Sequence, residues 1–261
     1  MPKAVPFKHF VEYCNEESER TRMLSFWKDH LSSSTFNYPA DLSNPKPAGV
    51  LVDKINLPVE AYAQTASVTA STVFQTAYTL LLSRLSGRTD VTYDYLLTGR
   101  NVDMDDPQLI NGTCANFLPF RSHWDNKTTE IGALLRETQN GFWQMTENGL
   151  VGLGDIYRAL GRERKAAAAK TLFLFQPFEP APPGQAQDHM RWIVMAMSKV
   201  TMFVNYAIMF EVFKDVQGNR LKMQYDTRLF TREQAVDAMK MYIEIVREIC
   251  NETKTVVGEL L

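Results

Sequence analysis

The sequence predicts an α/β fold in which helices pack on one face of a mixed β-sheet. Segments with the apolar pattern of strands alternate along the chain with longer segments whose apolar residues recur at helical spacing. No internal repeat is detectable, so the two kinds of element are expected to build one mixed architecture. The 261 residues are 45% hydrophobic and 22% charged. A chain of this length can bury a full core as one large domain or two small ones.

The first half of the chain contains two helices with clear apolar stripes. The elements expected there are, in order, an opening segment with an aromatic cluster at 1–15, a helix at 16–31, a crossing loop at 32–49, a strand at 50–58, a buried helix at 69–86 and a strand at 90–98. Thr69 or Ser71 is expected to cap the buried helix and Gly87 to end it. An acidic loop follows the second strand.

The second half continues the alternation. The elements expected there are a strand at 115–124, a helix at 129–146, a short helix at 153–160, a helical surface turn at 162–170, a strand at 171–178, a rigid loop at 180–184, strands near 190–197, 202–213 and 219–226, and a helix at about 231–250. Gly218 and Asn219 are expected to form the turn between the last two strands. Thr231 is expected to cap the C-terminal helix.

Charge and composition exclude several classes of function. The formal net charge is −2 and no basic stripe stands out, so nucleic acid is not expected as a partner. The longest apolar stretches are far shorter than the ~20 residues of a membrane span, and no signal-peptide pattern is present. We therefore expect a cytoplasmic protein without membrane contact.

No cofactor or metal site is expected from the sequence. Cys14, Cys114 and Cys250 are far apart and odd in number, which is typical of buried free thiols rather than of a disulfide frame or a zinc site. The acidic run at 103–106 lacks the spacing of a calcium-binding loop, so it is interpreted as solvated. There is also no nucleotide-binding loop and no cofactor fingerprint.

Six segments match a known family in order and spacing. They are FKHFVEY at 7–13, LLLSRLSGRTDV at 80–91, LLTGRN at 96–101, INGTCANFLPFR at 110–121, KTLFLFQPF at 170–178 and NRLKMQYDTRLFT at 219–231. Together they resemble the C-terminal lobe of a nonribosomal peptide synthetase condensation domain, or of a condensation-like terminal cyclising domain, of the fungal kind. The resemblance covers essentially the whole chain.

The resemblance implies one lobe of the chloramphenicol-acetyltransferase type over residues 1–261, with an opening segment at 1–48 and a sheet-and-helix core at 49–261. The family's catalytic histidine lies in an HHxxxDG motif on the other, N-terminal lobe. This chain has His9, His30, His123 and His189, and none of them belongs to such a motif. By the resemblance, the chain begins just after that motif. The family takes its substrates on the phosphopantetheine arms of carrier proteins and needs no other cofactor.

The candidate site residues come from the 110–121 segment and its continuation. Gly112 is expected to allow a tight turn, and Asn116 to satisfy backbone groups near the strand start. In the family, the arginine at the position of Arg121 is proposed to pair with the aspartate of HHxxxDG. An unpaired buried guanidinium is costly, so we expect Arg121 either to be exposed or to meet a carboxylate from a partner. His123 should point the same way as Arg121, and it is the alternative candidate for a general base. His30 lies in polar surroundings and carries no signal.

Three functions remain open. The chain could be part of a condensation or terminal cyclising domain, which joins an acyl or peptidyl thioester to an amine or hydroxyl. It could be a truncated enzyme of a secondary-metabolite cluster that uses Arg121 or His123 for another reaction. It could also be a module without catalysis that docks a carrier protein or a missing N-terminal lobe. A single lobe should expose apolar surface, so we also expect a homo-oligomer or a partner lobe.

Overall fold

A computed structural model describes most of the chain. The described residues are 4–34, 38–39, 42–124, 128–161, 169–176, 205–215 and 218–261. The rigid loop expected at 180–184 and the strand expected near 190–197 lie outside these residues, as does all of the surface turn expected at 162–170 except its last two residues. The strands are β1 (Val5–Pro6), β2 (Pro47–Ile55), β3 (Asp90–Leu97), β4 (Ile110–Asn111), β5 (Asn116–His123), β6 (Thr171–Gln176), β7 (Ile208–Asp215) and β8 (Gly218–Asp226). The α-helices are α1 (Phe7–Cys14), α2 (Glu17–Leu31), α3 (Val59–Thr65), α4 (Ala70–Ser86), α5 (Ile131–Glu147), α6 (Leu153–Ala159) and α9 (Arg232–Asn251).

The main sheet is mixed, and its six described strands follow the order β2-β8-β7-β6-β3-β5. Strand β6 runs parallel to both of its neighbours, β3 and β7. The pairs β2–β8, β7–β8 and β3–β5 are antiparallel. The prediction of an α/β fold with a mixed sheet is therefore confirmed. Strands β1 and β4 form a separate parallel pair beside α1.

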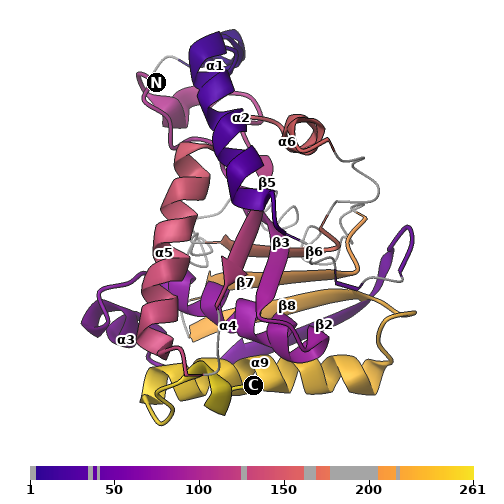
Figure 1. Ribbon diagram of the computed structural model, residues 1–261. Helices are drawn as coiled ribbons and strands as arrows, with labels where there is room; N and C mark the ends of the chain where they lie inside the picture. Colours follow the sequence, from indigo (N-terminus) through magenta and orange to yellow (C-terminus); the bar gives the residue numbers. More distant parts are fainter. Residues whose placement is uncertain are drawn as a thin grey trace, which may run out of the picture.

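Helices α4, α5 and α9 enclose the main apolar core against one face of the sheet (Figure 1). Strand residues alternate between the two faces, so Phe173 of β6 joins this core while its neighbours Leu172 and Leu174 point to the opposite face. There they form a smaller cluster with Tyr206 and Met209. The packing of helices on one face agrees with the prediction from the sequence.

The two helices with the strongest sequence signals begin and end where they were expected. The hydroxyl of Thr69 accepts a hydrogen bond from the backbone N–H of Thr72 at the start of α4, and Gly87 ends that helix with a φ of 69°. Thr231 and Gln234 form a reciprocal capping box at the start of α9. The central helix α4 is tied to α9 by the phenol of Tyr242, which donates a hydrogen bond to the backbone oxygen of Phe74.

Three expectations were wrong: where β2 begins, that no helix follows it, and which residues form the turn between β7 and β8. Strand β2 begins at Pro47, three residues earlier than predicted, and the helix α3 follows it where no helix was predicted. Gly218 and Asn219 do not form the hairpin turn, because both are already paired in β8. Gly218 has a φ of 109°, and an added Cβ would lie 2.4 Å from Oδ1 of Asn56. The glycine therefore serves a close approach between neighbouring segments rather than the turn itself.

Within the described residues, no helix is long and apolar enough to cross a membrane.

Candidate functional site

An open hollow of about 500 Å³ lies beside β5. Three elements line it: the end of α2 with the turn that follows, the second half of β5 and one face of α5. Its lining residues are His30, Ser33, Phe120, Arg121, Ser122, His123, Glu137, Asn140, Gly141 and Gln144. Both catalytic candidates from the sequence, Arg121 and His123, therefore line the same hollow.

Arg121 is held by a carboxylate of its own chain. Its Nε and Nη2 atoms donate to the two oxygens of Asp90 over 2.9 and 2.8 Å. Its Nη1 donates to the backbone oxygen of His30 and to the hydroxyl of Ser33. The Arg121 side chain is 14% exposed and that of Asp90 is 23% exposed. The expectation of an exposed arginine or a partner's carboxylate was wrong, because β3 supplies the counter-charge.

The register of the sheet explains this ion pair. Strands β3 and β5 are antiparallel, with Thr92 opposite Arg121 and Asp90 opposite His123. Asp90 is thus the diagonal neighbour of Arg121 on the same face of the sheet, which is within reach of a long side chain. The two parallel N–H bonds to one carboxylate are the strong, geometrically fixed form of such a pair. Arg121 therefore links β5 to β3 and to the end of α2 through hydrogen bonds, and it is not a free cation.

His30 also belongs to the site, which the sequence did not indicate. Its ring stacks on Phe26 with centroids 5.3 Å apart and meets the edge of Trp27. Burial lowers the pKa of the imidazole, the charge of Arg121 lowers it further, and Asp90 partly opposes this. The neutral imidazole is therefore favoured beside the guanidinium. The available signal was its spacing from Phe26 and Trp27, which places it on the buried side of α2.

His123 ends β5 at the rim of the hollow, with an exposed side chain. It lies on the same face of the strand as Arg121, as the alternation predicts. Of the other histidines, His9 is exposed on α1 and is absent from the lining. His189 lies outside the described residues.

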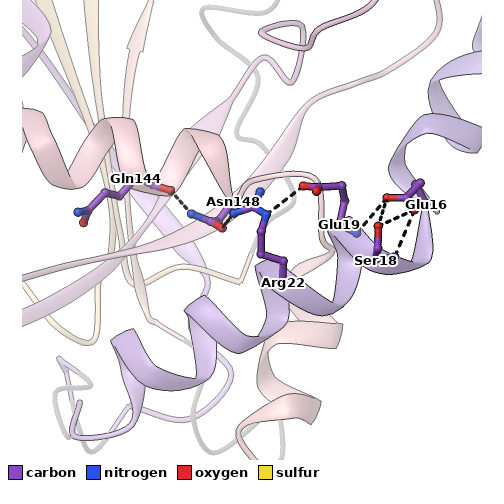
Figure 2. Close-up of polar contacts among 6 residues, drawn as sticks. All are labelled: Glu16, Ser18, Glu19, Arg22, Gln144 and Asn148. Atoms are coloured by element: carbon purple, nitrogen blue, oxygen red, sulfur yellow. Dashed lines mark hydrogen bonds and ion pairs between the residues drawn. The ribbon is translucent and has the colours of Figure 1, made fainter.

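The α2 wall of the hollow is clamped to the end of α5. Figure 2 shows the link: Nη1 of Arg22 donates to the side-chain oxygen of Asn148, whose amide nitrogen donates to the backbone oxygen of Gln144. One turn further along α2, Nε1 of Trp27 donates to the backbone oxygen of Asn148 over 2.7 Å. Arg20 adds an ion pair with Asp155 of α6. These contacts fix α2, and with it His30, against the core.

Asn116 and Gly112 make different kinds of contact, and the structural role expected for both stays a prediction. The amide nitrogen of Asn116 donates to the backbone oxygens of Gly149 and Val151, both over 2.9 Å, so it does satisfy backbone groups. Gly112 has little room, since an added Cβ would lie 2.3 Å from Cδ2 of Phe7. The glycine is needed for the close approach of α1 more than for the turn. Asn116 begins β5, whereas Arg121 lies near its end.

Hydrogen bonding to polar groups, with Glu137 as an additional negative charge, is the chemistry that the hollow supports. The described residues contain no cluster of three or more histidine, cysteine, aspartate or glutamate side chains that could hold a metal ion. Arg121 and Asp90 neutralise one another, and His30 favours its neutral form. The amides of Asn140 and Gln144 remain available on the α5 wall.

Comparisons with known proteins place these features in context. The family model described as Condensation domain matches residues 1–261. Nonribosomal peptide synthetase 7 of Aspergillus fumigatus is 48% identical over 259 residues, which are 98% of this chain and 11% of that protein. Nonribosomal peptide synthetase sidE of the same fungus is 42% identical over 249 residues, which are 94% and 12% of the two chains. The solved condensation domain from the Monacolin K polyketide synthase MokA superimposes with a TM-score of 0.73 at 15% identity, over 94% of this chain and 60% of that one.

Proposed function

The chain belongs to the condensation-domain family, and we propose that it forms the C-terminal lobe of a condensation domain in a fungal nonribosomal peptide synthetase. The complete domain would join an acyl or peptidyl thioester on one carrier protein to an amine or hydroxyl on another. The observation that carries this proposal is that 94% of the chain matches only part of a solved condensation domain. The chain spans 60% of that domain and about a ninth of the two synthetases.

We propose further that the catalytic base belongs to polypeptide outside these 261 residues. The state of the ionisable groups in the hollow supports this. Arg121 is committed to Asp90, and an always-protonated guanidinium cannot take a proton from an attacking amine. The ring of His30 is stacked on Phe26 and half-buried, which restricts its reach to a substrate. This lobe would then hold and orient the substrates, and the other lobe would supply the proton acceptor.

A chimera, in which this chain replaces the matching segment of a related synthetase, tests the proposal. The 259 matched residues of the Aspergillus fumigatus synthetase 7 are replaced by this chain, and carrier-bound products are detected by mass spectrometry of the intact protein. We expect the chimera to form the same condensed product as the parent enzyme. A folded chimera whose carrier proteins load with substrate, but which forms no condensed product, would contradict the proposal.

A second function, a different reaction carried out by this lobe alone, has one observation in its favour. Arg121 and His123 line the same hollow, so a base and a cation lie close to one another. In this case the purified chain should turn over an acyl thioester with an amine, and His123→Gln should remove the turnover. Equal turnover by the chain and by His123→Gln would exclude it.

A further inference from the structure

Strand β5 lies beside the hollow and is the last strand of the described sheet, so no described strand pairs with its outer edge. The backbone N–H of Trp124 donates to the backbone oxygen of Thr89, and the register places these two residues opposite one another. Antiparallel ladders alternate between bonded and non-bonded pairs. Arg121 and Thr92 therefore form a non-bonded pair, and the N–H and C=O of Arg121 point away from β3.

Pro119 supports this assignment. By the same alternation its nitrogen faces the free edge, and proline, which has no N–H to donate, is tolerated on such an edge. Among the described backbone hydrogen bonds of turns, loops and caps, none involves the N–H or C=O of Arg121, which agrees with the orientation that the register gives. The part of β5 that lines the hollow, Phe120 to His123, begins directly after the proline. The open backbone groups and the hollow thus coincide.

The opposite wall offers groups that bind peptide amides. Asn140 and Gln144 lie four residues apart on α5, so they share a face of the helix. Neither side-chain amide has a hydrogen-bond partner among the described residues. Each can donate and accept at once. Gly141 lies between them, and an added Cβ there would be 3.2 Å from the ring of Phe120, so the glycine lets the two walls approach.

The charges of the lining residues indicate which kind of segment could bind in the hollow. Arg121 and Asp90 cancel one another, and among the described lining residues Glu137 is the acidic side chain without an ion-pair partner. A basic side chain on the occupant would complement it. An extended segment carrying a lysine or arginine therefore fits both the backbone edge and the charge.

We propose that this hollow is a docking groove in which an extended, basic polypeptide segment adds to the edge of β5 and is held on its other side by α5. The mode is strand addition, in which main-chain hydrogen bonds give affinity and side-chain contacts give specificity. The occupant we assign rests on the proposed function: it is a segment of the condensation domain outside this chain. The solved condensation domains contain further polypeptide that could supply this segment, since the chain spans only 54–60% of three of them.

Tiled peptides test the groove. Ten-residue peptides are made to cover the part of the condensation domain of the Aspergillus fumigatus synthetase 7 that lies outside the matched residues. Their binding to the 261-residue chain is followed by fluorescence anisotropy. We expect a peptide with a basic residue to bind and to slow hydrogen exchange of the Arg121 amide at least ten-fold. If no peptide binds, or if the bound peptide protects amides elsewhere and not at Arg121, the proposal is overturned.

Matched variants separate the backbone from the side chain. Arg121→Pro and Arg121→Ala both lose the ion pair with Asp90, but only the proline removes the outward N–H. We expect Arg121→Ala to keep measurable binding and Arg121→Pro to lose it, with Glu137→Gln weakening the basic peptide several-fold. Equal binding by the two Arg121 variants would contradict the proposal. If the proline variant does not fold, the test is the hydrogen exchange of the Arg121 amide in the unaltered chain, measured with and without the peptide. An exchange rate that the peptide does not change would overturn the proposal.

The chimera described above keeps the two proposals distinct. An active chimera combined with a groove that binds no peptide overturns the docking proposal alone. An inactive chimera overturns the proposed function, whatever the peptides do.

Discussion

The indole nitrogen of Trp27 donates a hydrogen bond over 2.7 Å to the backbone oxygen of Asn148, and both residues are buried. This bond joins α2 to the end of α5. Trp27→Phe keeps an aromatic ring but leaves the carbonyl oxygen unsatisfied, which should lower the free energy of unfolding by about 1–3 kcal/mol. Urea unfolding followed by circular dichroism measures it. Trp143→Phe is the matched control, because Trp143 is 46% exposed, and should change stability by no more than about 0.5 kcal/mol. Equal effects would mean that the bond does not hold α2.

Asp90→Asn tests how much the ion pair between Asp90 and Arg121 contributes to stability. The amide retains the size of the carboxylate but loses its charge, and the guanidinium is left with one acceptor where it had two. Because both side chains are less than a quarter exposed, we expect a loss of about 1–3 kcal/mol in the free energy of unfolding. Asp103→Asn, on the exposed acidic loop, is the control. A loss that vanished in 1 M salt would show that the pair acts as an exposed one.

His30 should make stability depend on pH. Its pKa is lowered from 6.5 in the folded chain by burial and by Arg121. Below pH 6.5 the unfolded chain therefore binds more protons than the folded one, and stability falls as the pH falls through this range. The urea midpoint should drop less between pH 7.5 and 5.5 in His30→Gln than in the unaltered chain. His9→Gln, at an exposed position on α1, should follow the unaltered chain. An identical slope in all three proteins would contradict the assignment.

Asn116 should be sensitive to changes that preserve its size. Asn116→Ala removes two hydrogen bonds to backbone oxygens, which should cost about 2 kcal/mol at about 1 kcal/mol each. Asn116→Asp is expected to cost at least as much, because a carboxylate cannot donate to Gly149 and Val151. Thermal unfolding compares the two with Asn111→Ala, whose side chain is exposed. An aspartate variant as stable as the unaltered chain would show that the amide does not donate there.

Gly112→Ala should displace α1, since the new methyl group would meet the ring of Phe7. Relieving such a clash typically costs about 1–3 kcal/mol. The double variant with Phe7→Ala should recover part of this loss. Gly154→Ala is the matched control: no atom lies within 4 Å of an added Cβ there, and this helical position should gain up to about 1 kcal/mol. Differential scanning calorimetry gives all three values, and no recovery in the double variant would rule out Phe7 as the obstacle.

The sequence predicts the long helices well because their signals are local. Helix α4 has a threonine cap and a C-terminal glycine, and α9 has a capping box, so each end can be recognised within a few residues. Helix α3 lacks these signals. It has seven residues, follows Pro58 and has no side-chain cap, so its existence depends on Val59 and Ala63 being buried in the tertiary fold.

The site was only partly predictable for the same reason. Arg121 and His123 could be named from a motif, but the partner of Arg121 depends on how β3 and β5 are paired. Asp90 lies 31 positions away in the chain, and only the antiparallel register makes it a diagonal neighbour. His30 was overlooked because its role arises from what α2 packs against. The prediction of self-association stays a prediction, although Val50 and Val52 of β2 are exposed.

The order of the strands in the sheet also determines when each strand can pair during synthesis. In the described sheet, β2 is paired with β8 alone, and β8 is made about 160 residues later. At roughly 5–20 residues per second, the ribosome leaves β2 without its neighbour for roughly 8–30 s. Throughout that interval a nine-residue strand with exposed valines offers both edges to any other nascent chain. Aggregation through β2 is therefore expected to compete with folding until β8 has been synthesised.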